Sequence, residues 1–138
     1  MSQSYVIVEG AGALFAVPQA QVREIVPARQ ITRLPGAPAS VRGLLNVRGT
    51  LVTVVDLATR FGRGKSLGDD PSVVIAVTES RTLGLLVDDV LDVQAYSAAD
   101  FVAATVEPAD KSLVGMGHFG DRIVLAVDLQ ELARQTLA

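Results

Sequence analysis

Short apolar runs alternate along this chain with clusters of Gly, Pro, Asp and Ser. Val, Ile and Leu dominate the runs, and β-branched residues between turn-forming clusters are typical of β-strands. Segments 9–13 and 78–81 have the Gly and Ser content of hairpin turns. The pattern therefore predicts strands over residues 5–8, 13–17, 22–26, 43–47, 51–55, 73–77, 82–87, 90–94, 113–117 and 123–127.

Two helices are expected, each beginning at an Asp-Leu pair. The first is short and follows Asp56, and the second starts at Asp128. A carboxylate at the start of a helix accepts hydrogen bonds from amides without a helical partner, so both Asp residues are predicted to be N-caps rather than an acid–base pair. Glu131, three residues after Asp128, suits a capping box. The second helix has one apolar face, formed by Leu129, Leu132, Ala133 and Leu137.

The chain contains an internal repeat. The segment "LVTVVDL" (51–57) returns 72 residues later as "IVLAVDL" (123–129), and each copy follows a glycine corner. A weaker echo links "VREI" (22–25) with "VLDV" (90–93). A repeat of this length predicts two similar β lobes, each too small to be stable alone. Residues 1–138 would then form one domain of two intertwined lobes, with an approximate join near 62–71.

Composition narrows the class of protein. An apolar fraction of 49% and a charged fraction of 20% suit a folded core. The net charge of −3 argues against nucleic acid as a partner, because phosphate binding needs a basic face. There is no Cys to form a disulfide or bind metal, and no apolar run long enough to cross a bilayer. A soluble cytoplasmic protein without direct membrane insertion is expected.

Three segments with candidate chemistry do not complete a site. "GKS" (64–66) resembles the end of a phosphate-binding loop, but the required earlier Gly is Thr59 and no helix is predicted to follow. "DDVLD" (88–92) lacks the spacing of a calcium loop and is interpreted as a solvated acidic strand edge. His118, the only histidine, is expected at the tip of the second glycine corner, and its counterpart in the first corner is Val47 or Arg48. No catalytic residue, metal site or cofactor is predicted.

The corner "NVRG" (46–49) places a charged Arg48 directly before an apolar strand. A solvated turn residue is one explanation. A docking residue is the other, because a guanidinium held on a stiff backbone loses little entropy when it binds carboxylate or backbone oxygens. The sequence around Arg48 does not decide between them.

Several motifs together resemble one family. "VRGLLNVRGTLVTVVDL" (41–57) combines a Gly, an Asn-x-Arg-Gly corner and an apolar Val-Asp-Leu strand. It is flanked in order by "VREIV", "ITRLPGAP", "LGLLVDDVLDV" and "LVGMGHFGDRIVLAVDL", which cover nearly the whole chain. This arrangement resembles the CheW-like chemotaxis coupling proteins, although Thr53 stands where the family often has Pro. The resemblance implies a mainly β fold of two SH3-like five-stranded β-barrel lobes with short helices, including a C-terminal helix.

The resemblance also implies a non-enzymatic adaptor. Such proteins couple the cytoplasmic signalling tips of chemoreceptors to the regulatory domain of a CheA-type histidine kinase, and so are recruited to membrane receptor arrays. Matching positions suggest four receptor-facing residues, two kinase-facing residues and one residue that could face either partner. These are Glu24, Gly43, Arg48 and Val90 for the receptor, Val6 and Val22 for the kinase, and Ile25 for either.

Other readings remain beside this one. Ordinary barrel core explains Val6, Val22 and Val90 at least as well as a partner contact does. The alternative function is a small-molecule-binding β-barrel module, which needs an apolar pocket with convergent polar groups. An aromatic content of 4% makes such a pocket unattractive.

Overall fold

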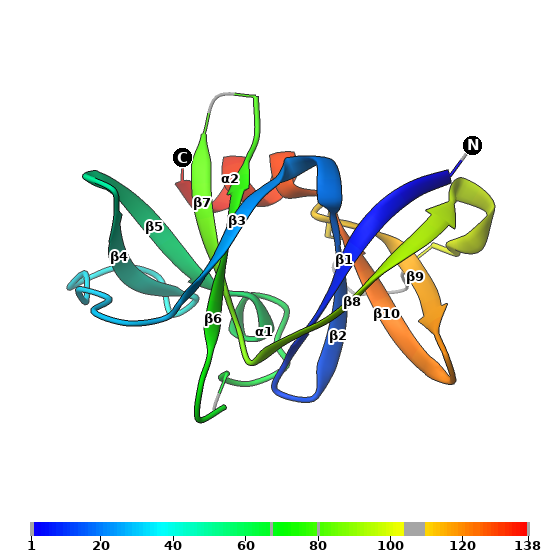
Figure 1. The fold of residues 1–138 in the computed structure, drawn as a ribbon, viewed down its shortest axis with the longest axis horizontal. Helices are drawn as coiled ribbons and strands as arrows, with labels where there is room; N and C mark the ends of the chain where they lie inside the picture. The colour runs from blue at the N-terminus through cyan, green and yellow to red at the C-terminus, as the bar shows by residue number, and fades with distance from the viewer. Residues whose placement is uncertain (1, 67, 80, 104–109, 138) are drawn as a thin grey trace.

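The computed structural model describes all residues except 1, 67, 80, 104–109 and 138, and consists mainly of strands (Figure 1). The strands predicted from the sequence are all present, several of them longer than expected. They are β1 (Ser2–Gly10), β2 (Ala13–Pro18), β3 (Val22–Pro27), β4 (Val41–Val47), β5 (Thr50–Asp56), β6 (Ser72–Val77), β7 (Thr82–Val87), β8 (Asp89–Ser97), β9 (Leu113–Phe119) and β10 (Arg122–Val127). The helices are α1 (Leu57–Arg60) and α2 (Leu129–Leu137), with 3-10 turns η1 (Gln19–Gln21) and η2 (Ala98–Asp100).

The strands form two five-stranded sheets of the same topology. The first has the order β8-β1-β2-β10-β9 and the second the order β3-β6-β7-β5-β4. In each sheet, a central antiparallel hairpin is followed by a parallel pairing and then by an antiparallel edge hairpin. The two repeat copies lie on β5 and β10, which occupy equivalent places in the two sheets. The predicted duplication of lobe topology is confirmed.

The lobes do not coincide with the two halves of the sequence. The first lobe contains β1 and β2 together with β8, β9 and β10, and the second contains β3 to β7. The chain therefore passes between lobes at η1 and again at Asp88, between β7 and β8. Segment 62–71, expected near the join of the lobes, connects α1 to β6 beside the second sheet. The approximate join of the lobes expected near 62–71 stays a prediction.

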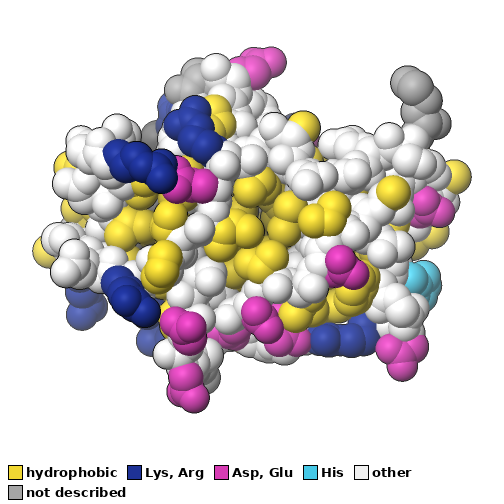
Figure 2. Space-filling model, viewed as in Figure 1, with side chains coloured by type: hydrophobic (Ala, Val, Ile, Leu, Met, Phe, Trp, Pro, Cys, Tyr) yellow, Lys and Arg dark blue, Asp and Glu magenta, His cyan; other side chains and the backbone are white. Residues whose placement is uncertain are grey.

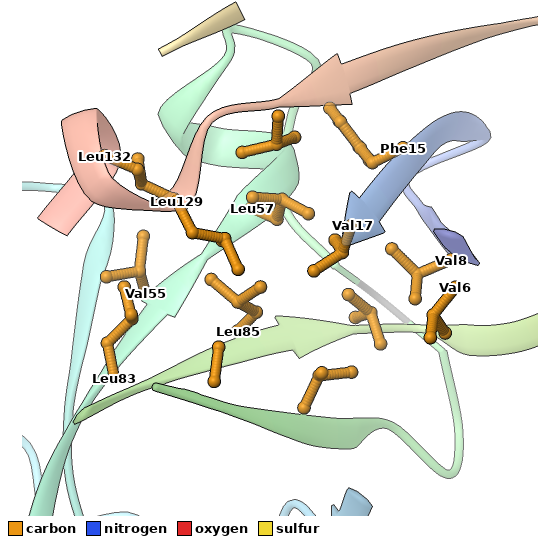
Figure 3. Close-up of a cluster of buried hydrophobic side chains, with 14 of the residues drawn as sticks. Val6, Val8, Phe15, Val17, Val55, Leu57, Leu83, Leu85, Leu129 and Leu132 are labelled. Atoms are coloured by element: carbon orange, nitrogen blue, oxygen red, sulfur yellow. The ribbon is translucent and has the colours of Figure 1, made fainter. Parts of the chain in front are cut away.

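Three groups of buried side chains hold the molecule together. One fills the first lobe and includes Tyr5 and Tyr96, and another fills the second lobe and includes Leu45 and Ile75. The third, called here the shared core, lies between the lobes and draws on both sheets and on α2 (Figure 3). Its members include Val8, Phe15, Val55, Leu57, Leu83, Leu85, Leu125, Leu129 and Leu132. Because each lobe lends one sheet face to this core, neither lobe covers its own apolar surface alone.

Both predicted helix caps are present, in different surroundings. Asp56 accepts a hydrogen bond from the amide of Thr59 at 3.4 Å, and Asp128 accepts one from the amide of Glu131 at 3.1 Å. Glu131 does not complete the predicted capping box, because its carboxylate binds Arg134 and the Asp128 amide donates to the carbonyl of Ser112.

Arg60 at the end of α1 connects the two lobes through a polar network. Its guanidinium donates from Nη1 to Asp110 Oδ2 at 3.1 Å and from Nη2 to Ser112 Oγ at 3.3 Å and to Gln135 Oε1 of α2 at 2.6 Å. Burial raises the pKa of the Asp110 carboxyl, but the hydrogen bonds from Ser112 and the guanidinium of Arg60 outweigh burial and hold that pKa below its ordinary value.

The network predicts a pH-dependent contribution to stability. A carboxyl with a lowered folded-state pKa stabilises the fold above its unfolded pKa, and that stabilisation is lost as pH falls through the folded pKa. At pH 7 we expect Asp110→Asn to lower the free energy of unfolding by about 1–2 kcal/mol. Urea unfolding between pH 7 and pH 3 should show the two proteins converging as the pH falls. A difference that stays constant over this range would contradict the role of the ionised carboxylate.

Candidate docking surface

The β4–β5 hairpin presents Arg48 at its tip. Arg48 and Gly49 are the two central residues, and both have positive φ, +50° and +86°, as in the two-residue turns that suit the twist of a hairpin. Asn46 Oδ1 accepts a hydrogen bond from the amide of Gly49 at 2.8 Å and holds the turn closed. Sequence reasoning did not assign Asn46 a role, although an Asn side chain that hydrogen-bonds nearby backbone is a known turn signal.

The Arg48 side chain is 78% exposed and pairs with Glu24 of β3. Its Nη1 donates a hydrogen bond to Glu24 Oε2, which orients the guanidinium across the second sheet. Among the described residues, this is the hydrogen bond that Arg48 makes, and a guanidinium carries five N–H donors. The pair therefore positions the charge while other donors stay available. Glu24 and Arg48, both predicted to face the receptor, are brought together although 24 residues separate them.

Two open hollows flank this ion pair. One, of ≈ 270 Å³, lies between β3 and β4, and its lining includes Val26, Pro27, Leu45 and Arg29. The other, of ≈ 160 Å³, includes Arg23, Ile75 and Thr82 in its lining. Both contain Glu24, Val47 and Arg48. The charged pair thus stands on a ridge between two shallow, partly apolar depressions.

Apolar side chains continue from this ridge across the middle of the molecule. Figure 2 shows hydrophobic groups gathered where β3 and β8 cross the view, with charged groups around them. Ile25 on β3 is 45% exposed and Val93 on β8 is 46% exposed. Contiguous exposed apolar surface with a polar rim is typical of a protein-binding face. The apolar residues of these two strands, called here the strip, are Val22, Ile25, Val26, Val90, Leu91 and Val93, of which Ile25, Leu91 and Val93 are exposed.

The apolar residues among the other predicted contacts differ in how far they are exposed at the surface. Val90 and Val22 are half-buried and pack against the shared core from the strip. Val6 is only 5% exposed and belongs to the shared core, as its alternative reading had it. Ile25 offers the most surface of these side chains.

Gly43 has a structural reason to be glycine. Its φ is +145°, and a Cβ there would lie 2.0 Å from the carbonyl oxygen of Thr32. That close approach lets Thr32 and Leu44 exchange backbone hydrogen bonds of 2.8 Å in both directions, which ties segment 28–40 to β4. Gly43 is buried, so packing alone accounts for it. The first lobe repeats the device on β9, with a Cβ at Gly115 meeting the carbonyl oxygen of Val102 at 2.6 Å.

Two of the segments with candidate chemistry differ from expectation. His118 lies within β9 opposite Ile123, so its counterpart is Asn46 opposite Leu51, and Gly120 forms part of the tip. Asp88 accepts hydrogen bonds from the amides of Ala11 and Gly68, both at 2.8 Å, so it ties loops together and is not part of a solvated edge.

Over the described part of the chain, no group of three or more His, Cys, Asp or Glu side chains is arranged to hold a metal ion. The helices within the described ranges are too short or too polar to span a bilayer.

Comparison with known proteins identifies the family. The family model described as CheW-like domain matches residues 4–137. This chain belongs to the CheW-like domain family. The scaffolding protein TtCheW from Thermoanaerobacter tengcongensis has a similar crystal structure, with a TM-score of 0.82 and 25% identity, over 94% of this chain and 86% of that one.

Sequence relatives agree with the structural neighbour. The chemotaxis protein CheW of Klebsiella aerogenes is 29% identical over 136 residues, which are 96% of this CheW-like chain and 82% of the relative. The chemotaxis protein CheW of Rhizobium meliloti is 38% identical over 90 residues, covering 62% of this chain and 56% of that protein.

These matches establish the class of function. The CheW-like chain is a non-enzymatic adaptor or scaffold of chemotaxis-type signalling, and the small-molecule-binding alternative is not favoured. The predicted mainly β fold with two SH3-like lobes is confirmed by the two five-stranded sheets and the similar scaffold structure.

Proposed function

We propose that this CheW-like chain couples the cytoplasmic signalling tip of a chemoreceptor to the regulatory domain of a CheA-type histidine kinase. The placement of Arg48 supports this proposal. Its guanidinium is largely exposed on a closed turn, and Glu24 orients it beside the apolar strip. Through the receptor, the adaptor would be recruited to membrane arrays without inserting into the bilayer.

The receptor contact would use Arg48 and the strip together. A helical tip offers acidic side chains and terminal carbonyls, which accept charge-assisted hydrogen bonds from a guanidinium. The aliphatic stem of Arg48 would cover apolar surface at the same time. Ile25 and Val90 supply neighbouring apolar area on the two strands of the strip. Gly43 would contribute indirectly, by setting the path of β4 behind the turn.

The kinase contact is proposed around the start of β3. Val22 is half-buried there and packs against the shared core. Val6 lies beneath the surface, so it would support this contact through packing rather than touch the kinase. Ile25 lies on β3, the strand that contributes to both proposed surfaces. Titrations of an Ile25 variant against each partner assign it to one of them.

The proposal predicts a selective loss of receptor binding in Arg48→Ala. Truncating a good interfacial Arg costs about 2 kcal/mol or more, close to thirtyfold in affinity. The probes are a soluble receptor-tip fragment and a kinase regulatory domain from the host, titrated separately by calorimetry. Arg48→Ala should weaken the tip titration about thirtyfold and leave the kinase titration near wild type. Arg48→Lys should recover part of the affinity, because an ammonium lacks the planar fork.

Stability serves as the control for this experiment. The Arg48–Glu24 pair is exposed on the Arg side, so Arg48→Ala should change the free energy of unfolding by at most about 1 kcal/mol. Lys111→Ala, an exposed substitution in the first lobe that lines neither hollow, should leave both titrations unchanged. Parallel Ile25→Ala titrations assign that residue to the partner whose binding weakens. Unchanged receptor affinity in a folded Arg48→Ala protein would leave Arg48 as a solvated turn residue.

A further inference from the structure

A third hollow, of ≈ 480 Å³, is lined by segment 31–42 and Lys65 and shares no lining residue with the two hollows beside Arg48. Three cations stand around it: Arg33 in that segment, Arg42 on β4, and Lys65 in the connection between the sequence repeats. Its walls include the aliphatic side chains of Ile31 and Leu34. The hollow therefore combines positive charge with apolar surface, in a protein whose net charge is −3.

The buried carboxylate of Asp56 holds one of these cations in place and fixes the residue beside another. Asp56 is 0% exposed and accepts a hydrogen bond from Arg42 Nη1 at 3.2 Å. It also accepts hydrogen bonds from the amide and hydroxyl of Ser66, at 3.1 and 3.2 Å, and this contact fixes the residue next to Lys65. Asp56 pairs with Arg42 alone among these cations, so Arg33 and Lys65 leave an excess of positive charge at the rim.

The wall of the hollow is held by backbone hydrogen bonds. Thr32 is bridged to Leu44, the backbone amide of Val41 donates to the carbonyl of Pro38 at 2.9 Å, and the backbone amide of Asp56 donates to the carbonyl of Ser40 at 2.7 Å. Two prolines in the segment further restrict its backbone. A preformed wall lowers the entropic cost of binding a ligand.

The duplicated fold supplies an internal comparison. The position equivalent to Arg42 in the second repeat is Val114, which is 55% exposed. Asp128, the equivalent of Asp56, accepts the cap hydrogen bond from Glu131, and no Arg pairs with it among the described residues. A cap of this kind therefore does not require an Arg partner. Arg33 and Lys65 make no ion pair among the described residues, so no contact within the fold accounts for these two cations, and both stay available to a ligand.

We propose that this hollow binds an acidic peptide segment that carries an aliphatic side chain. Carboxylates are the partners that guanidinium and ammonium groups prefer in peptides, and the aliphatic walls would cover an apolar residue between them. The volume is many times that of one water molecule, so a single inorganic anion would leave most of it unfilled. The hollow shares no lining residue with those beside Arg48, so the adaptor could bind the receptor tip and the acidic peptide at the same time.

The test uses the full chain and a fluorescein-labelled peptide Glu-Glu-Leu-Glu-Glu, with Gln-Gln-Leu-Gln-Gln as its uncharged match. The variant Arg33→Glu/Lys65→Glu removes two rim cations and spares Arg42, which pairs with Asp56. The control Arg81→Glu/Lys111→Glu makes the same change in net charge at exposed positions outside the hollow. Fluorescence anisotropy measures affinity, and amide NMR shifts locate the peptide.

We expect the acidic peptide to bind at least tenfold tighter than its uncharged match, and at least tenfold tighter to wild type than to Arg33→Glu/Lys65→Glu. The control should stay within twofold of wild type, and the largest amide shifts should fall in 31–42 and 64–66. Equal weakening in both double variants would mean nonspecific charge attraction and would overturn the proposal. So would binding of inorganic phosphate, but not of the peptide, at the same amides, because that result assigns the hollow to a small anion.

Discussion

Replacing Leu85 by Ala should lower the free energy of unfolding by about 3 kcal/mol and destabilise both lobes together. Leu85 is fully buried in the shared core, where β7 of the second lobe faces side chains from the first lobe and α2 (Figure 3). Its removal would leave a cavity lined by residues of both lobes. Since neither lobe covers its own sheet face, the loss cannot be confined to the sheet that carries the substitution.

The two tyrosines make this prediction measurable. Tyr5 and Tyr96 both lie in the core of the first lobe, and the chain has no Trp, so tyrosine fluorescence reports on the lobe that does not contain Leu85. In Leu85→Ala, the urea midpoint followed by tyrosine fluorescence should shift as far as the midpoint followed by far-ultraviolet circular dichroism. Leu51→Ala, at a position 65% exposed, should change stability by no more than about 0.5 kcal/mol. A tyrosine transition that stayed at its wild-type midpoint would show that the lobes unfold independently.

Removing the Asp56 carboxylate should cost more than removing its counterpart in the repeat. Capping alone is worth about 1 kcal/mol, which is what we expect for Asp128→Ala. Asp56 is completely buried and also accepts hydrogen bonds from Arg42 and from the amide and hydroxyl of Ser66. Asp56→Ala removes these part-buried hydrogen bonds together with the cap, so its expected cost is about 3 kcal/mol.

Thermal and urea unfolding of the two variants in parallel measure this difference. Asp56→Asn, which keeps the volume and part of the hydrogen bonding, should fall between Asp56→Ala and wild type. Equal losses for Asp56→Ala and Asp128→Ala would mean that capping is all that Asp56 contributes. Binding of the receptor tip below the melting transition should persist in Asp56→Ala. A folded variant that had lost receptor binding would instead give this carboxylate a direct functional role.

The stability prediction and the docking proposals concern different parts of the second lobe. Arg48 stands at the tip of the β4–β5 hairpin, and Asp56 lies at the other end of β5. Loss of stability at Asp56 can therefore be separated from loss of binding at Arg48. The same separation applies to the basic hollow, because its test variant keeps both Asp56 and Arg42.

Local features of the sequence determined the elements and their chemistry. Each strand was predictable because β-branched runs end at Gly, Pro or Asp, and these signals act within a few residues. The cap at Asp56 and the β4–β5 turn at Arg48 follow from hydrogen bonds spanning three residues, which the sequence displays directly. The repeat of 51–57 at 123–129 placed β5 and β10 on equivalent strands, since matching apolar patterns select matching positions in a sheet.

The tertiary structure alone decided which strands share a lobe and which side chains meet. A sequence repeat is compatible with lobes built from separate halves or from exchanged strands, because local pairing signals are the same in both. Burying the shared core favours the exchange, which sends β3 to the second lobe and β8 to the first. Packing within the second lobe brings Glu24 of β3 to Arg48, and packing between the lobes buries Val6. Contacts of this kind depend on how distant strands pack, and no local pattern encodes that packing.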